Sequence, residues 1–460
     1  MDVKELYQQY NSLIGSTVKL EGWIRNHRKQ AHFGFIDFHD GTNFKSVQIV
    51  YEDHLVENFE EISKFKIGSA IEVCGVVSLS EGKGQEFEIK ATTVKLLGDC
   101  TDDFPIQPKR HTREFLREVA HLRPRTNLFQ AIFRIRSVAA HAIHTYFQER
   151  NYLYGHTPLI TCADCEGSDQ MFKITTLNFD NMPLTEEGNA DYSKDLFGKK
   201  AFITGSGQLH GETFAMAYKK IYTFGPTFRT ENSNTKIHAN EFWMIEPEIA
   251  FCDLEGLMDI EEEMLKFVVS YVLEHCPSEI EFCDKFVEKG LLDKLTKLVN
   301  SKFTRIAHKD VVDILLKADM KWEFKPDYLS DIAKEHEKYI TEYFNGPVFI
   351  TNWPKDIKAY YMKLNEDNAT VAAVDLVVPQ AGELMGGSQR EENYEKLMKR
   401  MEEMGVDGSG IEWYLNLRKY GGCVHSGFGM GFERLVIYLT GVDNIRDAIP
   451  FPRTPKNCEF

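Results

Sequence analysis

The sequence FRTENSNTKIHANEFWMIEPE, residues 228–248, contains the charged residues on which the interpretation of the whole chain depends. An apolar run leads into Arg229 and Glu231, a polar loop follows over residues 232–240, and a second apolar run begins at Phe242. Two runs of strand-forming residues joined by a polar loop predict an antiparallel hairpin with charged residues at its mouth.

Glu246 and Glu248 lie inside the second run and alternate with Ile245 and Ile249. Acids within an apolar run face an interior and need partners, because burying an unpaired charge is unfavourable. The alternative is a surface hairpin with a solvated charged face, which fits these apolar neighbours poorly. A cation and acids on facing strands suit a ligand that carries both an anionic phosphate and an amino group.

The hairpin resembles motif 2 of the class II aminoacyl-tRNA synthetases, which reads Phe-Arg-x-Glu, a loop with His or Arg, and then Phe and Glu. The spelling FRTENSN…HANEFWMIEPE is similar to the asparaginyl branch of that family. The resemblance implies an α+β protein, with an N-terminal OB-fold β-barrel followed by a class II catalytic domain in which helices flank an antiparallel sheet. It also implies an enzyme that uses ATP to join L-asparagine to tRNA(Asn) through an asparaginyl-adenylate.

Length and composition limit the other possibilities. The chain has 460 residues, enough for two or three domains, and its net charge of −16 disfavours non-specific nucleic-acid binding without excluding local basic patches. Nine cysteines without regular spacing argue against a disulfide framework. Apolar runs stay below about 18 residues and the N-terminus lacks an apolar signal segment, so we expect a cytoplasmic protein without a membrane span.

Residues 18–97 alternate between apolar and polar positions in short runs, as in a small all-β barrel. Basic and aromatic residues interleave at one end of this segment, a composition that stacks unpaired bases and holds phosphates, although a generic barrel could show it too. The segment is similar to the OB-fold anticodon-binding domain of class IIb synthetases. That resemblance implies that Phe35 stacks on the middle anticodon base, that Arg25 lies near the anticodon, and that Glu88 reads a base edge.

The patterns divide the chain into an anticodon-binding domain over residues 1–100, a hinge over residues 101–125 and a catalytic domain over residues 126–460. The hinge is either a solvated linker or, because its basic residues outnumber its acidic ones, a connector that touches the tRNA backbone. Within the catalytic domain, residues 277–345 are rich in Lys and Glu at helical spacing. They predict a helical insertion with a packing role.

Apolar residues recur at helical spacing over residues 127–150, and a strand-like stretch containing Pro158 follows at residues 152–160. Helix, strand and proline in this order are similar to motif 1 of class II synthetases, which forms their dimer interface, so the resemblance implies a homodimer. Without it, the helix would be core packing and Pro158 would mark an edge strand, since proline cannot donate a ladder hydrogen bond.

Two segments before the hairpin match places where the family holds the α-ammonium of the amino acid. Glu166 lies in the sequence DCEGSDQMF, and Ser206 and Gln208 lie in the sequence FITGSGQLHGE. A carboxylate and an amide oxygen are suitable acceptors for an ammonium group. The resemblance therefore implies that these three residues bind asparagine.

The resemblance also assigns the contacts to ATP. Arg229 is expected at the α-phosphate and the substrate carboxylate, where its charge would stabilise the transition state. Glu231 is expected near the adenine or the acceptor end of the tRNA, His238 near the γ-phosphate, and Phe242 on one face of the adenine. Arg434, in the sequence GFGMGFERLVIYLTG, is expected over the opposite face as a second catalytic residue.

Asp375 interrupts the apolar run at residues 371–378, and Glu383 follows in a short loop. Two carboxylates at the end of a strand can hold Mg²⁺ against ATP phosphates, and the resemblance implies that these two residues do so. The spacing between them is one residue longer than in aspartyl enzymes, so Glu383 matches the family register better than Asp375 does.

Hydrogen-bond chemistry bears on the choice of amino acid. An asparagine side chain presents one acceptor oxygen and one NH₂ donor, whereas an aspartate side chain calls for cations. Arg390, in the sequence GGSQRE, supplies a donor and Glu246 supplies an acceptor. Aspartyl enzymes have a lysine at the place of Gly211, and the loss of that cation favours the carboxamide; an unpaired buried charge would cost on the order of 3 kcal/mol or more.

Three other functions stay open. An aspartyl-tRNA synthetase is the nearest of them. A nucleic-acid-binding relative without catalysis would be expected to lack Arg229, Glu383 or Arg434, all of which are present. A free-standing enzyme that only activates an amino acid would be expected to lack the N-terminal barrel.

Overall fold

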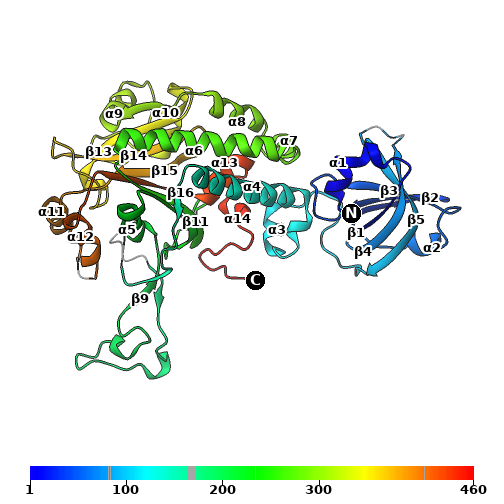
Figure 1. The fold of residues 1–460 in the computed structure, drawn as a ribbon, viewed down its shortest axis with the longest axis horizontal. Helices are drawn as coiled ribbons and strands as arrows, with labels where there is room; N and C mark the ends of the chain where they lie inside the picture. The colour runs from blue at the N-terminus through cyan, green and yellow to red at the C-terminus, as the bar shows by residue number, and fades with distance from the viewer. Residues whose placement is uncertain (81, 83, 164, 166–170, 234, 409) are drawn as a thin grey trace. The chain divides into compact units, whose positions relative to one another are not determined.

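The structure is a computed structural model that describes residues 1–460 except residues 81, 83, 164, 166–170, 234 and 409. The chain divides into two compact units, Met1–Ala131 and Ile132–Phe460. Figure 1 shows the course of the chain through both units. Of the helices in the described ranges, none combines the length and the apolar character that a membrane span requires.

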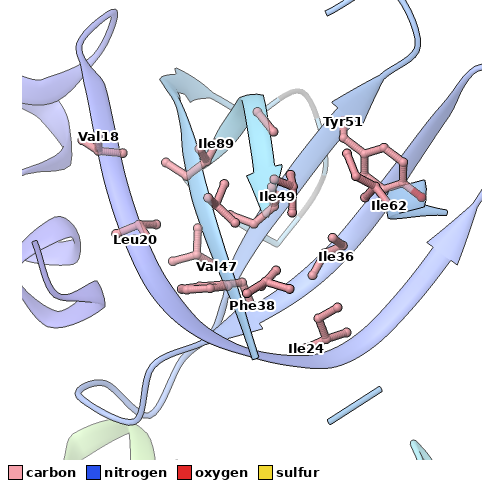
Figure 2. Close-up of a cluster of buried hydrophobic side chains, with 14 of the residues drawn as sticks. Val18, Leu20, Ile24, Ile36, Phe38, Val47, Ile49, Tyr51, Ile62 and Ile89 are labelled. Atoms are coloured by element: carbon pink, nitrogen blue, oxygen red, sulfur yellow. The ribbon is translucent and has the colours of Figure 1, made fainter. Parts of the chain in front are cut away.

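The first unit contains a closed β-barrel, which confirms the predicted OB-fold. The strand order is β1-β2-β3-β5-β4, with β3 and β5 parallel and the other pairs antiparallel. Alternate residues of each strand point inward, so Leu20, Ile36 and Ile49 meet in a buried core that Figure 2 shows. The strands are β1 (Thr17–Lys29), β2 (Phe33–His39), β3 (Val47–Glu52), β4 (Ala70–Leu79) and β5 (Phe87–Gly98).

Three helices accompany the barrel in the first unit. α1 (Val3–Leu13) buries Val3 and Leu6 in the barrel core, and the short α2 (Phe59–Ile62) adds two further apolar residues to it. α3 (Arg113–Glu118) lies in the predicted hinge and begins at Thr112, whose side chain accepts a hydrogen bond from the N–H of Phe115. The predicted hinge therefore contains local helical structure.

The main sheet of the second unit has eight strands among the described residues, in the order β12-β13-β14-β15-β16-β11-β10-β6. Its interior pairs are antiparallel, and the edge strands β12 and β6 join in parallel. The strands are β6 (Leu153–Tyr154), β10 (Lys220–Phe228), β11 (Glu241–Ala250), β12 (Thr304–Ala307), β13 (Val348–Pro354), β14 (Thr370–Val378), β15 (Gly382–Gln389) and β16 (His425–Gly431).

The predicted hairpin is confirmed as β10 and β11, which pair from Lys220 opposite Ile249 to Phe228 opposite Glu241. β11 also pairs with β16, so it lies inside the sheet and its second half is buried. Glu246 and Glu248 are two residues apart and therefore share one face of the sheet.

Helices cover the sheet. α6 (Leu254–His275) lies along β14, β15 and β16, as Figure 1 shows, and α5 (Gln208–Tyr218) packs against the hairpin. α4 (Asn127–Glu149) and α13 (Phe432–Thr440) confirm the helices predicted from the apolar spacing. Three further helices of the second unit are α11 (Tyr394–Met404), α12 (Glu412–Lys419) and α14 (Ile445–Ala448).

The stretch at residues 152–160 departs from the prediction of one strand. β6 ends at Tyr154, and the chain regains strand structure only at β7 (Ile160–Thr161), which pairs with β9 (Ala201–Ile203) in a second sheet with β8 (Lys173–Ile174). Pro158 lies between the two strands, where it cannot donate a ladder hydrogen bond. The chain therefore leaves one sheet for another at this point, and in Figure 1 the β9 segment stands away from the main sheet.

The insertion contains the helices that its composition predicted. They are α7 (Pro277–Phe286), α8 (Leu291–Asn300), α9 (His308–Lys317) and α10 (Lys334–Tyr343). The insertion also contributes β12, which was not predicted and which extends the main sheet beside β13. The insertion is thus joined to the sheet that carries the candidate site.

Candidate active site

A cavity of about 350 Å³ lies in the second unit, and its wall brings together segments that are far apart in the sequence. Of the site residues predicted for the catalytic domain, all but one line this cavity: Ser206, Gln208, Arg229, Glu231, His238, Phe242, Glu246, Asp375, Glu383, Arg390 and Arg434. The exception, Glu166, lies outside the described residues.

Arg390 forms a bidentate ion pair with Glu248 at the inner end of the cavity. Its Nε and Nη2 atoms donate to the two carboxylate oxygens at 3.2 and 2.5 Å, and its Nη1 donates to Ser388 Oγ at 2.7 Å. Glu248 is 1 % exposed and Arg390 is 4 % exposed. Burial raises the pKa of Glu248 above its ordinary value, and the facing guanidinium opposes that rise. Arg390 therefore already pairs with an acid of the protein.

The backbone of β16 makes room for this ion pair. Gly427 lies opposite Glu248 in the sheet, and a Cβ atom at that glycine would lie 2.3 Å from the Glu248 carboxylate carbon. A larger residue would displace the carboxylate, so the glycine is required by close packing.

Glu246 is also buried, but its partners differ from those of Glu248. It accepts hydrogen bonds from Ser206 Oγ at 2.5 Å and from the backbone N–H of Gly207 at 2.9 Å. The prediction that both acids face an interior and have partners is thus confirmed. The sequence predicted that Glu246 is the acid beside Arg390. In the structure, Arg390 forms its ion pair with Glu248 instead. The two-residue spacing was the signal that both acids belong to one site.

Glu212 is a buried acid that sequence reasoning missed. It accepts hydrogen bonds from Arg418 Nη2 at 2.8 Å, Tyr414 OH at 3.1 Å and Gln208 Nε2 at 3.2 Å, and His425 Nε2 lies 2.9 Å away. Burial alone would raise the pKa of Glu212, but Arg418 and His425 hold it well below its usual range.

The same network orients Gln208. Gln208 lines the cavity, and because its amide nitrogen donates to Glu212, its carbonyl oxygen stays available as an acceptor. The four-residue spacing between these two residues on α5 is the sequence signal that could have identified Glu212.

Gly211 occupies the place where aspartyl enzymes carry a lysine, and the structure shows what that place faces. A Cβ atom at Gly211 would lie 3.4 Å from Glu248 Cγ and 3.2 Å from Ile221 Cδ1. A side chain there would pack against Glu248 and Ile221. Because Gly211 has no side chain, Glu248 pairs with Arg390 without a competing group from this position.

Asp375 and Glu383 lie on β14 and β15 and approach each other across Gly386. A Cβ atom at Gly386 would lie 3.1 Å from Glu383 Oε1 and 3.4 Å from Asp375 Oδ1. The pairing register shifts by one residue between Leu376 and Val377, so β15 carries a bulge. The residue without a register partner is Leu384, so the bulge directly follows Glu383, and both acids line the cavity.

The two acids fit a divalent cation. Burial raises the pKa of Asp375 to about 6, Lys358 Nζ donates to its Oδ2 atom at 2.6 Å and opposes the rise, and the charge of Glu383 adds to it. Within the described residues, no group of three or more His, Cys, Asp or Glu side chains is arranged to hold a metal ion. Two carboxylates with hard oxygen donors suit Mg²⁺ that takes its other ligands from phosphates and water.

The predicted nucleotide contacts lie around the mouth of the cavity. Arg229 Cζ lies 5.5 Å from the centroid of the Phe242 ring, and Arg434 Nη1 donates to the backbone oxygen of Glu383 at 3.1 Å. His238 Nε2 lies 4.0 Å from Glu231. Burial lowers the pKa of His238, and the nearby charges of Arg434 and Arg229 also lower it.

Glu433, which also lines the cavity, links three elements. It accepts a hydrogen bond from Arg136 Nη2 on α4 at 2.8 Å and another from the backbone N–H of Trp243 on β11 at 2.9 Å. Burial raises the pKa of Glu433, and Arg136 opposes that rise. The first turn of α13, which also carries Arg434, is thereby held against the hairpin.

In the first unit, Phe35 lies on β2 with a cation over its ring. That cation is Arg28, whose Cζ lies 5.4 Å from the ring centroid, and Phe33 packs edge-on against Phe35 at 5.4 Å. Arg25 lies at a bulge in β1 and donates instead to Asn127 Oδ1 at 2.7 Å. The structure therefore brings Arg28, rather than Arg25, together with the predicted stacking residue.

Glu88 lies on β5 and is 9 % exposed. Its Oε2 atom accepts hydrogen bonds from Gln48 Nε2 and Ser80 Oγ, each at 3.2 Å, and from Gln85 Nε2 at 3.3 Å. These four residues form a polar cluster on β3, β5 and the loop before β5.

Comparison with known proteins agrees with this geometry. Residues 112–455 match the family model of the class II tRNA synthetases (D, K and N), and residues 18–97 match that of the OB-fold nucleic acid binding domain. The asparagine–tRNA ligase of Acholeplasma laidlawii is 57 % identical over 461 aligned residues, which cover 100 % of both chains.

Solved structures agree in fold. The asparaginyl-tRNA synthetase of Pyrococcus horikoshii, complexed with asparaginyl-adenylate, has a TM-score of 0.85 and 32 % identity, covering 98 % of this chain and 97 % of that one. The enzyme of Entamoeba histolytica, also in complex with asparaginyl-adenylate, has a TM-score of 0.83 and 25 % identity, with 97 % of each chain covered. The resemblance inferred from the hairpin is confirmed, and the chain belongs to the class II tRNA synthetases and, within them, to the family of the asparagine–tRNA ligases.

Proposed function

We propose that the protein joins L-asparagine to tRNA(Asn) in two steps. Asparagine first reacts with ATP to give asparaginyl-adenylate and pyrophosphate, and the asparaginyl group then passes to the terminal adenosine of the tRNA with release of AMP. The observation that carries the proposal is the inner end of the cavity, where Arg390 is already neutralised by Glu248 and Glu246 lies nearby as a second acid.

This arrangement favours a neutral side chain. The guanidinium of Arg390 retains N–H groups that can donate to the carboxamide oxygen, and the acids can accept from the carboxamide NH₂. An aspartate side chain would bring a third negative charge beside two buried acids, which raises its binding free energy steeply in a site with little water. Asparagine is therefore the substrate that the charges support.

Positioning and charge stabilisation supply the catalysis, and the proposal assigns no covalent nucleophile. Glu166, Ser206 and Gln208 would hold the α-ammonium, Arg229 would bind the substrate carboxylate and the α-phosphate, and Arg434 would lie over the adenine that stacks on Phe242. Binding both reactants in one cavity aligns the carboxylate with the α-phosphorus. Arginine charge at the reacting phosphate offsets the negative charge that develops in the transition state.

Glu231 and His238 complete the proposed nucleotide site, with His238 at the γ-phosphate. Asp375 and Glu383 would hold Mg²⁺, which when bound neutralises the phosphates and orients them for the reaction. Lys358 adds a cation beside the same acids. A residue with this contact and this burial could not be selected from the sequence, where it is one lysine among many.

ATP–pyrophosphate exchange tests the proposal and separates it from the aspartyl alternative. Exchange should depend on asparagine, and the kcat/KM for asparagine should exceed that for aspartate by more than about 100-fold, because the wrong side chain leaves buried polar groups unpaired. Exchange that prefers aspartate would overturn the assignment, and protein that binds tRNA without exchange would favour a non-catalytic relative.

The first unit would bind the anticodon through Phe35, Arg28 and Glu88, with Arg25 at the margin of that surface. Aromatic residues and cations on a barrel face suit unpaired bases and their phosphates. We place the enzyme in the cytoplasm, in keeping with its odd number of cysteines.

We also propose a homodimer through α4 and the segment after it, where Leu153, Tyr154 and Ile160 are exposed apolar residues. Sedimentation at micromolar concentration should give a mass near twice 53.0 kDa. A mass of one chain at that concentration would contradict the dimer.

A further inference from the structure

The insertion reaches the candidate cation site through one residue. α10, the last helix of the insertion, packs against β14 and β15 and carries Glu337 to the turn that joins these strands. The Glu337 carboxylate lies over this turn beside Gly382, and it interacts favourably with the backbone of Glu383. The helix therefore holds the backbone of a residue whose side chain lines the cavity.

Gly382, the first residue of β15, lies directly beside the Glu337 carboxylate. A Cβ atom there would lie 2.4 Å from Glu337 Oε2, which leaves no space for a side chain while the carboxylate is in place. The φ angle of Gly382 is +75°, a conformation that L side chains rarely adopt. Space and backbone conformation both require glycine beneath Glu337.

Three acids lie close together around the turn between β14 and β15. Glu337 lies within electrostatic range of both Glu383 and Asp375, and the cations that face the three acids are Arg434 and Lys358. Neighbouring carboxylates repel one another, so the arrangement is unfavourable unless it serves to hold a positive charge. An acid that only packed the insertion against the sheet would have no reason to lie beside two other acids.

We propose that Glu337 is a positioning residue for the cation site. It caps the turn between β14 and β15 and so holds the Glu383 side chain beside Asp375, ready to bind Mg²⁺ with ATP. This inference rests on the proposed function, because that function assigns the two acids to Mg²⁺. It also gives the insertion a role beyond packing, since the insertion then sets the geometry of the nucleotide site.

Hydrogen exchange of the free protein tests the contact without any ligand. In Glu337→Ala the carboxylate that covers the turn between β14 and β15 is lost, so exchange of the Glu383 amide should accelerate by about tenfold or more. Glu337→Gln keeps an acceptor oxygen and should retain most of the protection. Glu342→Gln, a matched change on the exposed side of the same helix, should leave the exchange at the turn unchanged.

Pyrophosphate exchange tests the consequence for the cation site. Glu337→Ala should raise the Mg²⁺ concentration for half-maximal rate and the KM for ATP by about tenfold, the usual effect of removing a group that orients a metal ligand. The KM for asparagine should change by less than about twofold, because its pocket lies at the other end of the cavity. Glu337→Gln should lie between Glu337→Ala and the unmodified protein.

Gly382→Ala provides a second route. Its methyl group should displace the carboxylate and raise the Mg²⁺ requirement, and this effect should shrink in the Glu337→Ala background while the backbone strain stays the same in both. Equal effects in both backgrounds, or a Glu337→Ala protein with unaltered exchange at Glu383 and an unaltered Mg²⁺ requirement, would overturn the inference. Absence of asparagine-dependent exchange in the unmodified protein would overturn the proposed function instead, while the amide exchange would still report on the contact.

Discussion

Glu246 and Glu248 show how much the surroundings of a single residue decide. Both are buried glutamates on one face of β11, yet Glu248 is bound by a guanidinium and Glu246 by a hydroxyl and a backbone N–H. Glu248 therefore compensates the positive charge of Arg390. Glu246 can still accept a hydrogen bond from a ligand. The two acids divide the work of recognising a carboxamide.

Glu246→Gln should lower the preference for asparagine over aspartate by about tenfold or more, because the new amide can donate to a carboxylate and the acceptor charge is gone. The measurement is pyrophosphate exchange with each amino acid. Glu241→Gln, at the exposed start of the same strand, is the control and should keep the preference. An unchanged preference in Glu246→Gln would rule out the proposed role.

Glu261 on α6 gives a prediction for pH dependence. It is fully buried, and that burial, with the charge of Asp375, raises its pKa well above the ordinary value. The folded protein then keeps a proton that the unfolded chain releases above about pH 4.3. The free energy of unfolding should therefore fall as pH rises from about 5 to 7, by up to about 1.4 kcal/mol per pH unit.

Glu261→Gln removes this titration and should flatten the decline. Urea unfolding at several pH values between about 5 and 7 measures the slope. Glu274→Gln, on the exposed side of the same helix, should keep the slope of the unmodified protein. Parallel slopes for Glu261→Gln and the unmodified protein would show that Glu261 does not hold a proton in the folded state.

Among elements, the packing of α13 depends on an ion pair that reaches back to α4. Glu433 is 2 % exposed in its side chain and Arg136 is 15 % exposed, so their pairing takes place largely away from water. Glu433 also accepts a hydrogen bond from the backbone of β11. One side chain on α13 therefore connects α4 and α13 to the hairpin.

Glu433→Ala should lower the free energy of unfolding by roughly 2–4 kcal/mol, since it leaves Arg136 and a strand N–H without their acceptor. Chemical denaturation measures the change. Glu263→Ala breaks the ion pair between Glu263 on α6 and Arg150, the residue after α4, but Glu263 is 56 % exposed, so the loss should stay below about 1 kcal/mol. Similar losses in the two variants would contradict the importance of burial.

On the scale of the whole molecule, the proposed anticodon-binding surface and the candidate active site lie in separate compact units. The barrel of the first unit has its own hydrophobic core, and the candidate active site is lined entirely by residues of the second. A change on the barrel surface should therefore affect steps that involve the tRNA and leave adenylate formation intact.

Phe35→Ala should reduce the kcat/KM of tRNA charging by about 10-fold, because stacking of one base on an aromatic ring contributes about 1–3 kcal/mol. Pyrophosphate exchange, which needs no tRNA, should stay at the level of the unmodified protein. Leu79→Ala, an exposed change in the same barrel, should alter neither reaction. Equal loss in both reactions would indicate damage to the fold instead.

The local elements could be predicted because they follow from short-range pattern. The hairpin at residues 220–250, the helices α4 and α13, and the barrel each have a period of apolar residues that matches their geometry. The family resemblance then identified the residues that line the cavity. The prediction of one strand over residues 152–160 was wrong. The apolar pattern of a sequence does not reveal that the chain passes from one sheet to another around Pro158.

Sequence alone thus determined the order of the elements, the presence of two buried acids on one strand and the membership of the family. Only the tertiary structure decided which acid pairs with Arg390, which cation lies over Phe35, and that Glu212, Lys358 and Glu337 adjoin the site. The reason is physical: partners of a buried charge are chosen by distances across strands and helices that are remote in the chain. No local pattern records those distances.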